Sequence, residues 1–228
     1  MASSQLAQLP GGRPSVLVPL GSTEQHGPHL PLNTDTAIAS AVTSAAADRL
    51  TGWLVAPAIA YGASGEHQDF AGTISLGTEA LTVLLLEYGR SAACWAGRLV
   101  FVNGHGGNVE ALRDAVGLLR AEGRDIGWSP CLTAGADAHA GHTETSVMLH
   151  LSPDDVHTDR WLPGNEAPLS ELLTQLRHGG VAAVSSHGVL GNPTTATAAD
   201  GRRLFAEMTD GCVDRILRWS PGIDGMLR

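Results

Sequence analysis

The sequence predicts an α/β fold, a three-layer sandwich in which helices cover both faces of a mainly parallel sheet. Short apolar segments alternate along the chain with longer segments that carry apolar residues at helical spacing. Strands that alternate with helices are joined by right-handed crossovers and form parallel sheets. A length of 228 residues suits one domain, so residues 1–228 are expected to fold as a single unit.

The elements follow from this alternation. Strands are expected at residues 15–20, 53–60, 98–102 and 126–132. Helices are expected at residues 34–50, at 78–96 with Thr78 as the N-cap, from the loop after the third strand to about residue 122, in a short segment ending at residue 149, at 169–178 and at 196–219. Cys94 is expected in the core of the second helix, and residues 181–184 form a strand-like apolar run.

Composition excludes several classes of protein. The formal net charge of −9 and the absence of basic clusters argue against nucleic-acid binding. No apolar run is long enough for a membrane span, and the N-terminal residues lack the features of a signal peptide, so a cytoplasmic protein is expected. All fourteen Lys-plus-Arg residues are Arg, which excludes Schiff-base chemistry and a P-loop lysine.

A loop directly after the first expected strand concentrates acidic and imidazole side chains. Residues 21–35, GSTEQHGPHLPLNTD, contain Glu24, His26 and Asp35. Glu24 and His26 are two residues apart, so in an extended segment both side chains point to the same side. Asp35 lies at the start of the helix that follows this loop, where its carboxylate can supply a further oxygen ligand or bridge two ions. Carboxylate and imidazole together suit Zn²⁺, Mn²⁺ or Fe²⁺. An ordinary polar surface loop is the alternative.

Two further histidine-bearing loops also follow strands. They are residues 103–108, NGHGGN, and residues 137–144, DAHAGHTE. Ligands of parallel sheets lie outside the carboxyl ends of the strands, so the three loops are expected to share that edge. His105 could alternatively be a packed residue in an anion-binding turn at a helix N-terminus. One of His139 and His142 is expected not to contact a metal ion directly, but to lie behind the ligands or at the surface.

Four segments resemble the signature motifs of the creatininase (creatinine amidohydrolase) family. Three are residues 21–35, 103–108 and 139–146, and the fourth is residues 61–76, YGASGEHQDFAGTISL. They occur in the family's order over most of residues 15–150. The resemblance implies a dinuclear metal amidohydrolase with a three-layer α/β fold, two divalent ions (Zn, Fe or Mn), a peptide or small-molecule amide as substrate, and a homo-oligomer, commonly a hexamer.

By position, the resemblance implies a ligand set for each ion. One ion would be held by Glu24, Asp35 and His105, and the other by His26, the bridging Asp35 and a further Glu. In creatininase that Glu lies two residues after the motif His, where this chain has Gly107. Glu144 is therefore the candidate for the remaining ligand.

By resemblance, His139 matches the family's proton-transferring His. Glu66 stands beside His67 in a glycine-rich loop and is expected to take part in catalysis, but both could alternatively be ordinary surface residues. The residues expected to contact substrate are His67, Gly106, Gly107 and His142. Creatininase carries a Trp shortly before its catalytic His, whereas residues 135–138 here are GADA. The length and the first and third motifs are most similar to a branch that releases the C-terminal piece of a modified precursor peptide.

Other functions stay open at this point. A formamide hydrolase or a cyclic-amide hydrolase of the same family would need the same metal ligands. A non-enzymatic metal-binding scaffold would keep the ligands without turnover. A serine hydrolase using Ser64 is disfavoured, because Glu66 stands where the last glycine of a GxSxG motif belongs.

Overall fold

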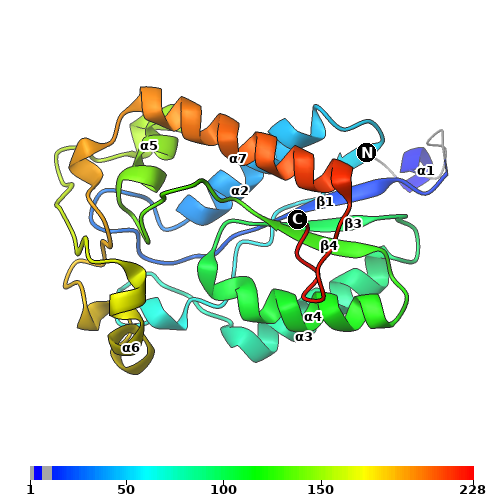
Figure 1. Cartoon of the computed structure of the whole chain (residues 1–228), viewed down its shortest axis with the longest axis horizontal. Coiled ribbons are helices and arrows are strands. Elements are labelled where there is room, and N and C mark those ends of the chain that lie inside the picture. The colour runs from blue at the N-terminus through cyan, green and yellow to red at the C-terminus, as the bar shows by residue number, and fades with distance from the viewer. Residues whose placement is uncertain (1–2, 7–11) are drawn as a thin grey trace.

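Four parallel strands form one sheet in the order β2-β1-β3-β4 in the computed structural model, which describes residues 3–6 and 12–228 (Figure 1). The strands are β1 (Ser15–Leu20), β2 (Trp53–Val55), β3 (Leu99–Asn103) and β4 (Ile126–Pro130). The register pairs Val18 of β1 with Phe101 of β3, and Phe101 with Trp128 of β4.

Helices and short turns connect these strands. The α-helices are α1 (Ser3–Leu6), α2 (Thr34–Ala47), α3 (Gly77–Ala92), α4 (Val109–Ala121), α5 (His142–Leu151), α6 (Leu169–Gly179) and α7 (Ala198–Arg218). The 3-10 turns are η1 (Gly65–His67), η2 (Gly106–Asn108), η3 (Pro153–Asp155), η4 (Val181–Ala183) and η5 (Pro193–Thr195). Within the described ranges, no helix is both long and apolar enough to cross a membrane.

The strand residues alternate between two hydrophobic cores, which produces the three layers. Leu17 of β1 packs with α2, α5 and α7 on one face of the sheet, whereas Val18 packs with α3 and α4 on the other. Val100 and Phe101 of β3 divide in the same way. Side chains alternate along a strand, so each buried strand contributes to both cores. Figure 1 shows the sheet between these two helical layers, which confirms the predicted α/β sandwich.

The topology creates a crevice between β1 and β3. These strands are neighbours, but α2 follows β1 on one face of the sheet and α4 follows β3 on the other. The two loops therefore diverge at the carboxyl edge and leave space between them. Doubly wound α/β sheets bind ligands at such a switch point. The loops that leave β1 and β3 here carry two of the histidine-bearing motifs, residues 21–35 and 103–108.

Some expected boundaries are wrong. The second strand ends at Val55 rather than at residue 60. Gly77, with φ of +76°, turns the chain into α3, so Leu76 occupies the N-cap position and Thr78 lies inside the first turn. Because α3 ends at Ala92, Cys94 lies in the following turn and is exposed. The apolar run near residue 181 forms η4 rather than a strand.

Replacing Phe101 by Ala is expected to lower the free energy of unfolding by about 3–5 kcal/mol, because the cavity left in a close-packed core collapses only partly. Phe101 is fully buried, and its ring lies 5.9 Å from that of Tyr88. Urea denaturation followed by circular dichroism measures the change. Phe101→Leu should cost less, because it leaves a smaller cavity. A loss below about 1 kcal/mol for Phe101→Ala would contradict the packing described here.

Candidate metal centre

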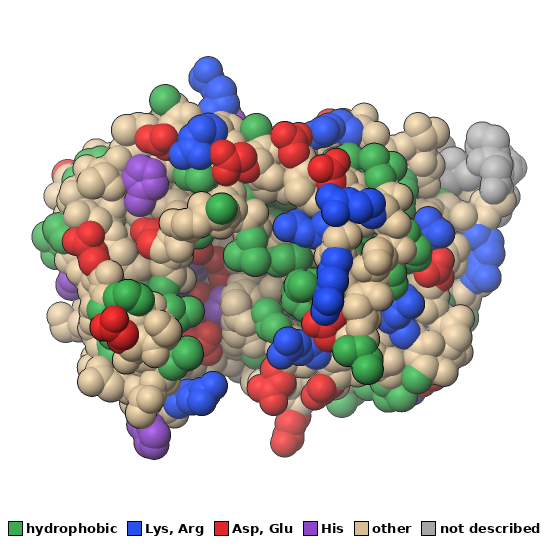
Figure 2. Space-filling model, in the orientation of Figure 1, with side chains coloured by type: hydrophobic (Ala, Val, Ile, Leu, Met, Phe, Trp, Pro, Cys, Tyr) green, Lys and Arg blue, Asp and Glu red, His purple; other side chains and the backbone are tan. Residues whose placement is uncertain are grey.

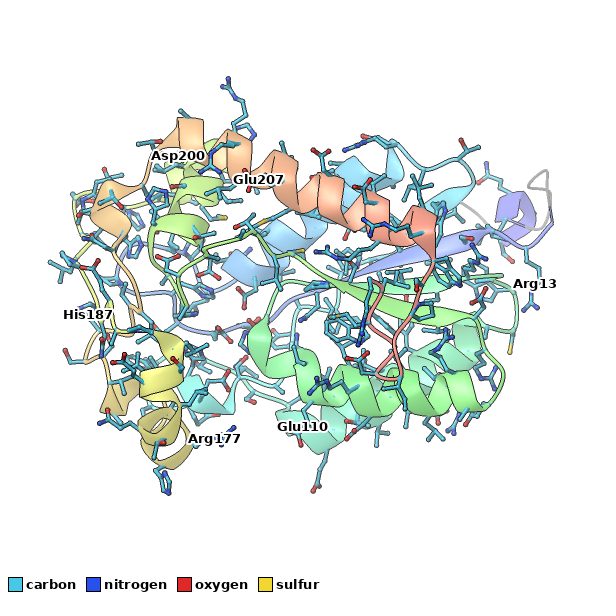
Figure 3. The ribbon with its side chains drawn as sticks, in the orientation of Figure 1. Arg13, Glu110, Arg177, His187, Asp200 and Glu207 are labelled. Atoms are coloured by element: carbon cyan, nitrogen blue, oxygen red, sulfur yellow. The ribbon has the colours of Figure 1, made fainter. Side chains whose placement is uncertain are left out.

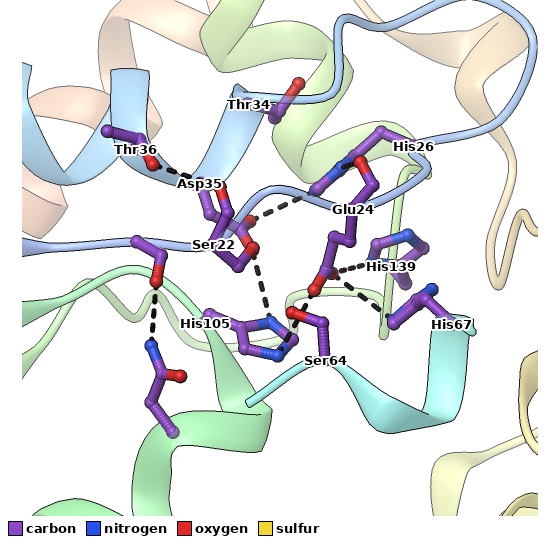
Figure 4. A network of polar contacts seen from close by, with 12 residues as sticks. Ser22, Glu24, His26, Thr34, Asp35, Thr36, Ser64, His67, His105 and His139 are labelled. Carbon is purple, nitrogen blue, oxygen red and sulfur yellow. Dashed lines mark hydrogen bonds and ion pairs between the residues drawn. The ribbon is translucent and has the colours of Figure 1, made fainter. Parts of the chain in front are cut away.

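Asp35 lies between two imidazole rings at the start of α2. Its Oδ1 is 3.1 Å from His26 Nε2, and its Oδ2 is 3.1 Å from His105 Nδ1 (Figure 4). Ser22 Oγ donates a hydrogen bond of 2.5 Å to Oδ2. His26 comes from the loop after β1 and His105 from the loop after β3, so Asp35 joins the two sides of the crevice.

Glu24 forms the second buried carboxylate of the cluster. Its Oε1 is 3.3 Å from His67 Nε2 and 3.7 Å from His139 Nδ1, and its Oε2 is 3.2 Å from His105 Nε2. Both oxygens are buried, yet neither has a hydrogen-bond partner of acceptable geometry. A buried carboxylate left in this state is costly, because its charge has been taken from water without compensation.

Two more carboxylates approach the same cluster. Glu144 Oε2 is 3.9 Å from His26 Nε2 and accepts a hydrogen bond of 2.6 Å from the main-chain N–H of Ala140. Glu66 Oε1 is 3.4 Å from His105 Nε2. Three groups of side chains have ligand atoms close enough to share an ion: Glu24 with Asp35 and His105, His26 with His139 and Glu144, and Glu24 with His67 and His139.

Burial and mutual charge shift the pKa values within the cluster. Burial raises the pKa of Glu24 to about 7, although the charge of His105 opposes this. Burial also works to raise the pKa of Asp35, but His26 and His105 outweigh it and hold that pKa well below its usual value. For His26, burial is again outweighed, and Asp35 raises the pKa to about 10. A cation between these groups would replace the proton that the carboxylates otherwise compete for.

Asn108 holds three loops of the site in place. Its amide nitrogen donates to the main-chain oxygen of Gly21 at 2.9 Å and to Asn103 Oδ1 at 3.1 Å. Its Oδ1 accepts a 2.9 Å bond from the N–H of Ala63. The loops after β1 and β3 and the segment before η1 are thereby connected by one buried side chain.

The predicted site residues fall into two groups. Those that meet in the cluster are Glu24, His26, Asp35, Glu66, His67, His105, His139 and Glu144. His142 belongs to none of the three groups, and its Nδ1 lies 2.9 Å from Thr195 Oγ1. Gly106 is exposed beside the cluster, whereas Gly107 is packed against it. His187, which the sequence leaves undecided, lies at the left edge of Figure 3 and belongs to none of the three groups.

The sequence does not indicate a role for Gln25. Strict alternation would turn this side chain away from Glu24 and His26, but the segment is not a regular strand, and Gln25 is buried behind the cluster. Its amide nitrogen lies 2.8 Å from His67 Nδ1 and 3.2 Å from His139 Nε2. Its position between two ligand-type residues in the first motif is the only available signal.

Carboxylates and imidazoles that converge at the carboxyl edge of a parallel sheet form a donor set suited to divalent metal ions. The sequence model of the creatinine amidohydrolase family matches residues 1–216. The chain therefore belongs to the creatininase family, and the resemblance of its motifs is confirmed.

Individual relatives agree with this assignment. The chain is 71% identical, over 235 residues, to the mycofactocin precursor peptide peptidase of Mycobacterium ulcerans, covering 100% of this chain and 94% of the relative. Among solved structures, a creatininase described as the Mn form is 29% identical, with a TM-score of 0.79 and 96% of each chain covered. A mutant creatininase of the Zn-Zn type is also 29% identical, with a TM-score of 0.78 over 96% of this chain and 95% of the other.

Proposed function

We propose that this protein hydrolyses a peptide amide bond in the mycofactocin precursor peptide and releases the modified C-terminal piece. The similarity to a mycofactocin precursor peptide peptidase supports the substrate. The observation that carries the chemistry is the buried cluster around Asp35, where carboxylates and imidazoles lie within 3.1–3.9 Å of one another. Such a donor set suits divalent ions rather than a purely organic mechanism.

The ligands of one ion would be Glu24, Asp35 and His105, whose donor atoms already form one compact group. Two orphaned, buried oxygens of Glu24 support this assignment, because a cation would satisfy both. His105 Nε2 lies 3.1 Å from the main-chain oxygen of Ala63, to which it can donate, and this leaves Nδ1 free toward Asp35. Metal-binding histidines usually donate their other ring N–H in this way.

The ligands of a second ion would be His26, Glu144 and the bridging Asp35. His26 Nδ1 lies 3.2 Å from the main-chain oxygen of Glu24, so the imidazole can donate there and present Nε2 to Asp35 and Glu144. Burial raises the pKa of Glu144 to about 7, a cost that a neighbouring cation would remove. Zn²⁺, Mn²⁺ and Fe²⁺ all accept such oxygen and nitrogen ligands.

Divalent ions held here would supply an activated water and polarise the scissile carbonyl. The side chains of the chain would then handle protons and position the peptide. His139 is proposed to take the proton of the attacking water and to donate it to the departing amide nitrogen. Glu66 and His67 reach the cluster from η1 and would orient the substrate. The general-acid contribution is expected to be about 10²–10⁴-fold.

Two cavities, each lined by one carboxylate of the cluster, favour a peptide over a single small ring. A cavity of about 840 Å³ is lined by Gly106, His142 and Glu144 together with apolar residues such as Ile38, Leu132 and Leu190. Glu66 lines a second cavity of about 530 Å³. Figure 2 shows a hollow left of centre in which acidic and histidine side chains are visible. A chain passing across the cluster would occupy both cavities.

The decisive experiment compares substrates and metals with one protein preparation. Metal-loaded protein should cleave the modified precursor peptide with kcat/KM at least about 100-fold above that for creatinine or a formamide, a difference of about 2.7 kcal/mol in transition-state binding. Chelation should abolish cleavage, and Zn²⁺, Mn²⁺ or Fe²⁺ should restore it. Equal or faster turnover of the small amides, or full activity in chelator, would refute the proposal. No turnover of any amide would favour a metal-binding scaffold.

A serine nucleophile receives no support from the geometry. Ser64 is fully buried, and its Oγ makes no hydrogen bond of acceptable geometry to an imidazole, whereas an activated serine needs a positioned base. Insensitivity of the cleavage to a serine-directed fluorophosphonate is therefore expected.

Gly107→Ala is expected to weaken metal binding by about tenfold or more, because its side chain would displace the groups around one ion. A Cβ at residue 107 would lie 2.2 Å from the main-chain oxygen of Ala63, 2.5 Å from His105 Nε2 and 2.7 Å from Glu66 Oε1. Gly106→Ala is the matched control for metal affinity, since a Cβ there meets nothing within 4 Å. Competition with a chromophoric chelator measures both variants, and equal affinities would contradict the prediction.

The assembly and location remain proposals. Family resemblance supports a homo-oligomer, commonly a hexamer, and the cytoplasmic location expected from the sequence stays a prediction. Light scattering coupled to size-exclusion chromatography tests the oligomer, and a monomer of 23.6 kDa would refute it.

A further inference from the structure

Two histidines, His67 and His139, face Glu24 but are not among the proposed metal ligands. Gln25 contacts both of them. It lies behind the cluster, and its side-chain nitrogen is 2.8 Å from His67 Nδ1. Its main-chain oxygen is 2.8 Å from His139 Nε2. The rings of His67 and His139 are themselves in contact, with centroids 4.3 Å apart and a tilt of 43° between the ring planes. One residue therefore determines the hydrogen bonding of two neighbouring imidazoles.

The orientation of the Gln25 amide follows from two main-chain groups. The N–H of Gly27 can only donate, and it lies 2.8 Å from Gln25 Oε1. The oxygen of Gly188 can only accept, and it lies 3.1 Å from Gln25 Nε2. A Cβ at residue 188 would come within 1.9 Å of Oε1, so a glycine is needed for this close approach. The amide nitrogen must therefore be the atom that faces His67.

The orientation of the Gln25 amide determines which nitrogen of His67 carries the proton. An amide nitrogen has two N–H donors and no lone pair available for accepting. With one hydrogen directed to Gly188, the other is directed to His67 Nδ1, which must accept. The neutral ring then carries its proton on Nε2. That N–H faces Glu24 Oε1 at 3.3 Å and Glu66 Oε1 at 4.0 Å.

His139 is held in the same tautomer by a different contact. The main-chain oxygen of Gln25 accepts only, so His139 Nε2, 2.8 Å away, must carry a proton. The 3.2 Å approach between His139 Nε2 and Gln25 Nε2 then joins two donors and is not a hydrogen bond. The unprotonated Nδ1 of His139 faces Glu24 Oε1 at 3.7 Å.

We infer that Gln25 is a positioning residue that makes His67 a hydrogen-bond donor and His139 a proton acceptor toward the metal cluster. Both rings have the proton on Nε2, but a different nitrogen faces the cluster in each: Nε2 in His67 and Nδ1 in His139. His67 therefore presents an N–H and cannot ligate an ion through that nitrogen, which leaves it to donate to Glu24 or to a substrate oxygen. His139 presents a lone pair, which can take a proton from water and return it to the leaving nitrogen.

The inference rests on the proposed function only for its catalytic consequence, because the tautomers can be observed directly. The experiment is long-range ¹H–¹⁵N correlation NMR of ¹⁵N-histidine-labelled protein loaded with Zn²⁺, which is diamagnetic. Signals are assigned from His67→Asn and His139→Asn variants. Wild-type protein should show both rings as single Nε2–H tautomers, with His67 Nε2 not bound to zinc. A zinc-bound or unprotonated Nε2 on His67, or an Nδ1–H on His139, would overturn the inference.

Gln25→Met removes the side-chain donor with little change in volume. His67 should then lose its single-tautomer pattern, while His139, held by the main-chain oxygen, should keep its own. The kcat for peptide should fall about 10–100-fold, the usual effect of losing a group that orients a site residue, with KM changed less than about threefold. Gln175→Met, on exposed α6, is the matched control and should match wild type.

An unchanged His67 spectrum in Gln25→Met would overturn the inference. If that variant does not fold, the wild-type spectrum still decides the tautomers. If the wild-type protein shows the expected tautomers but cleaves no peptide, the proposed function fails while the assignment of Gln25 stands.

Discussion

Asp35→Ala is expected to lose bound metal and activity together, with kcat/KM falling by about 10⁴-fold, because Asp35 is the carboxylate proposed to be shared by the two ions. Asp35 is only 1% exposed, and its two oxygens face His26 and His105 at 3.1 Å each. Without Asp35, the two imidazoles would lose the negative charge that raises their pKa values and holds cations near them. Elemental analysis after dialysis, run beside peptide cleavage, measures both losses.

Two control variants separate the loss of the metal from a loss of the fold. Asp48→Ala removes an exposed acidic residue just after the same helix and should keep wild-type metal content and activity. Asp35→Asn keeps the shape of the side chain and should still lose metal, because one neutral amide cannot bridge two cations. Circular dichroism establishes that each variant is folded. A folded Asp35→Ala protein that keeps both its metal and its turnover would remove the basis of the proposed site.

His139→Ala is expected to reduce kcat by about 10²–10⁴-fold while the protein keeps its metal. The reason is that His139 would move the proton of the reaction and would not hold an ion. The metal content of this variant is informative, because His139 is close enough to His26 and Glu144 to share an ion with them. Metal content therefore distinguishes a proton carrier from a ligand.

The comparison for this variant is His157→Ala, an exposed histidine that should leave both kcat and metal content at wild-type values. Loss of metal in His139→Ala in proportion to its loss of activity would assign His139 to the ligands instead. Full activity in a metal-loaded His139→Ala protein would require another residue to protonate the leaving nitrogen.

Local patterns allowed much of the site to be predicted before any coordinates. Glu24, His26 and Asp35 stand in one glycine- and proline-punctuated loop, and His105 stands in a second loop after another strand. Parallel strands bring such loops to one edge, so their meeting follows from topology. Thr78 shows where local reasoning fails: a suitable capping residue was displaced because Gly77 turns the chain one residue earlier.

Gln25, Asn108 and Gly188 could not have been assigned their roles from the sequence. The contacts of Gln25 with His139 and with Gly188 join residues 114 and 163 positions apart in the chain. Asn108 similarly connects to Gly21 across 87 positions. Polar side chains of these types occur in many loops, and only their partners in space show which hydrogen bonds they make.

The chain by itself determined the class of chemistry and the layered architecture, because both depend on residue type and short-range spacing. Alternating apolar segments specify two buried faces, and a loop with carboxylates and imidazoles specifies a site for cations. Only the tertiary structure decided which nitrogen of each histidine faces the cluster, that Glu66 and Glu144 both approach it, and that each of these two carboxylates lines a different cavity. These properties depend on distances between segments that no local pattern encodes.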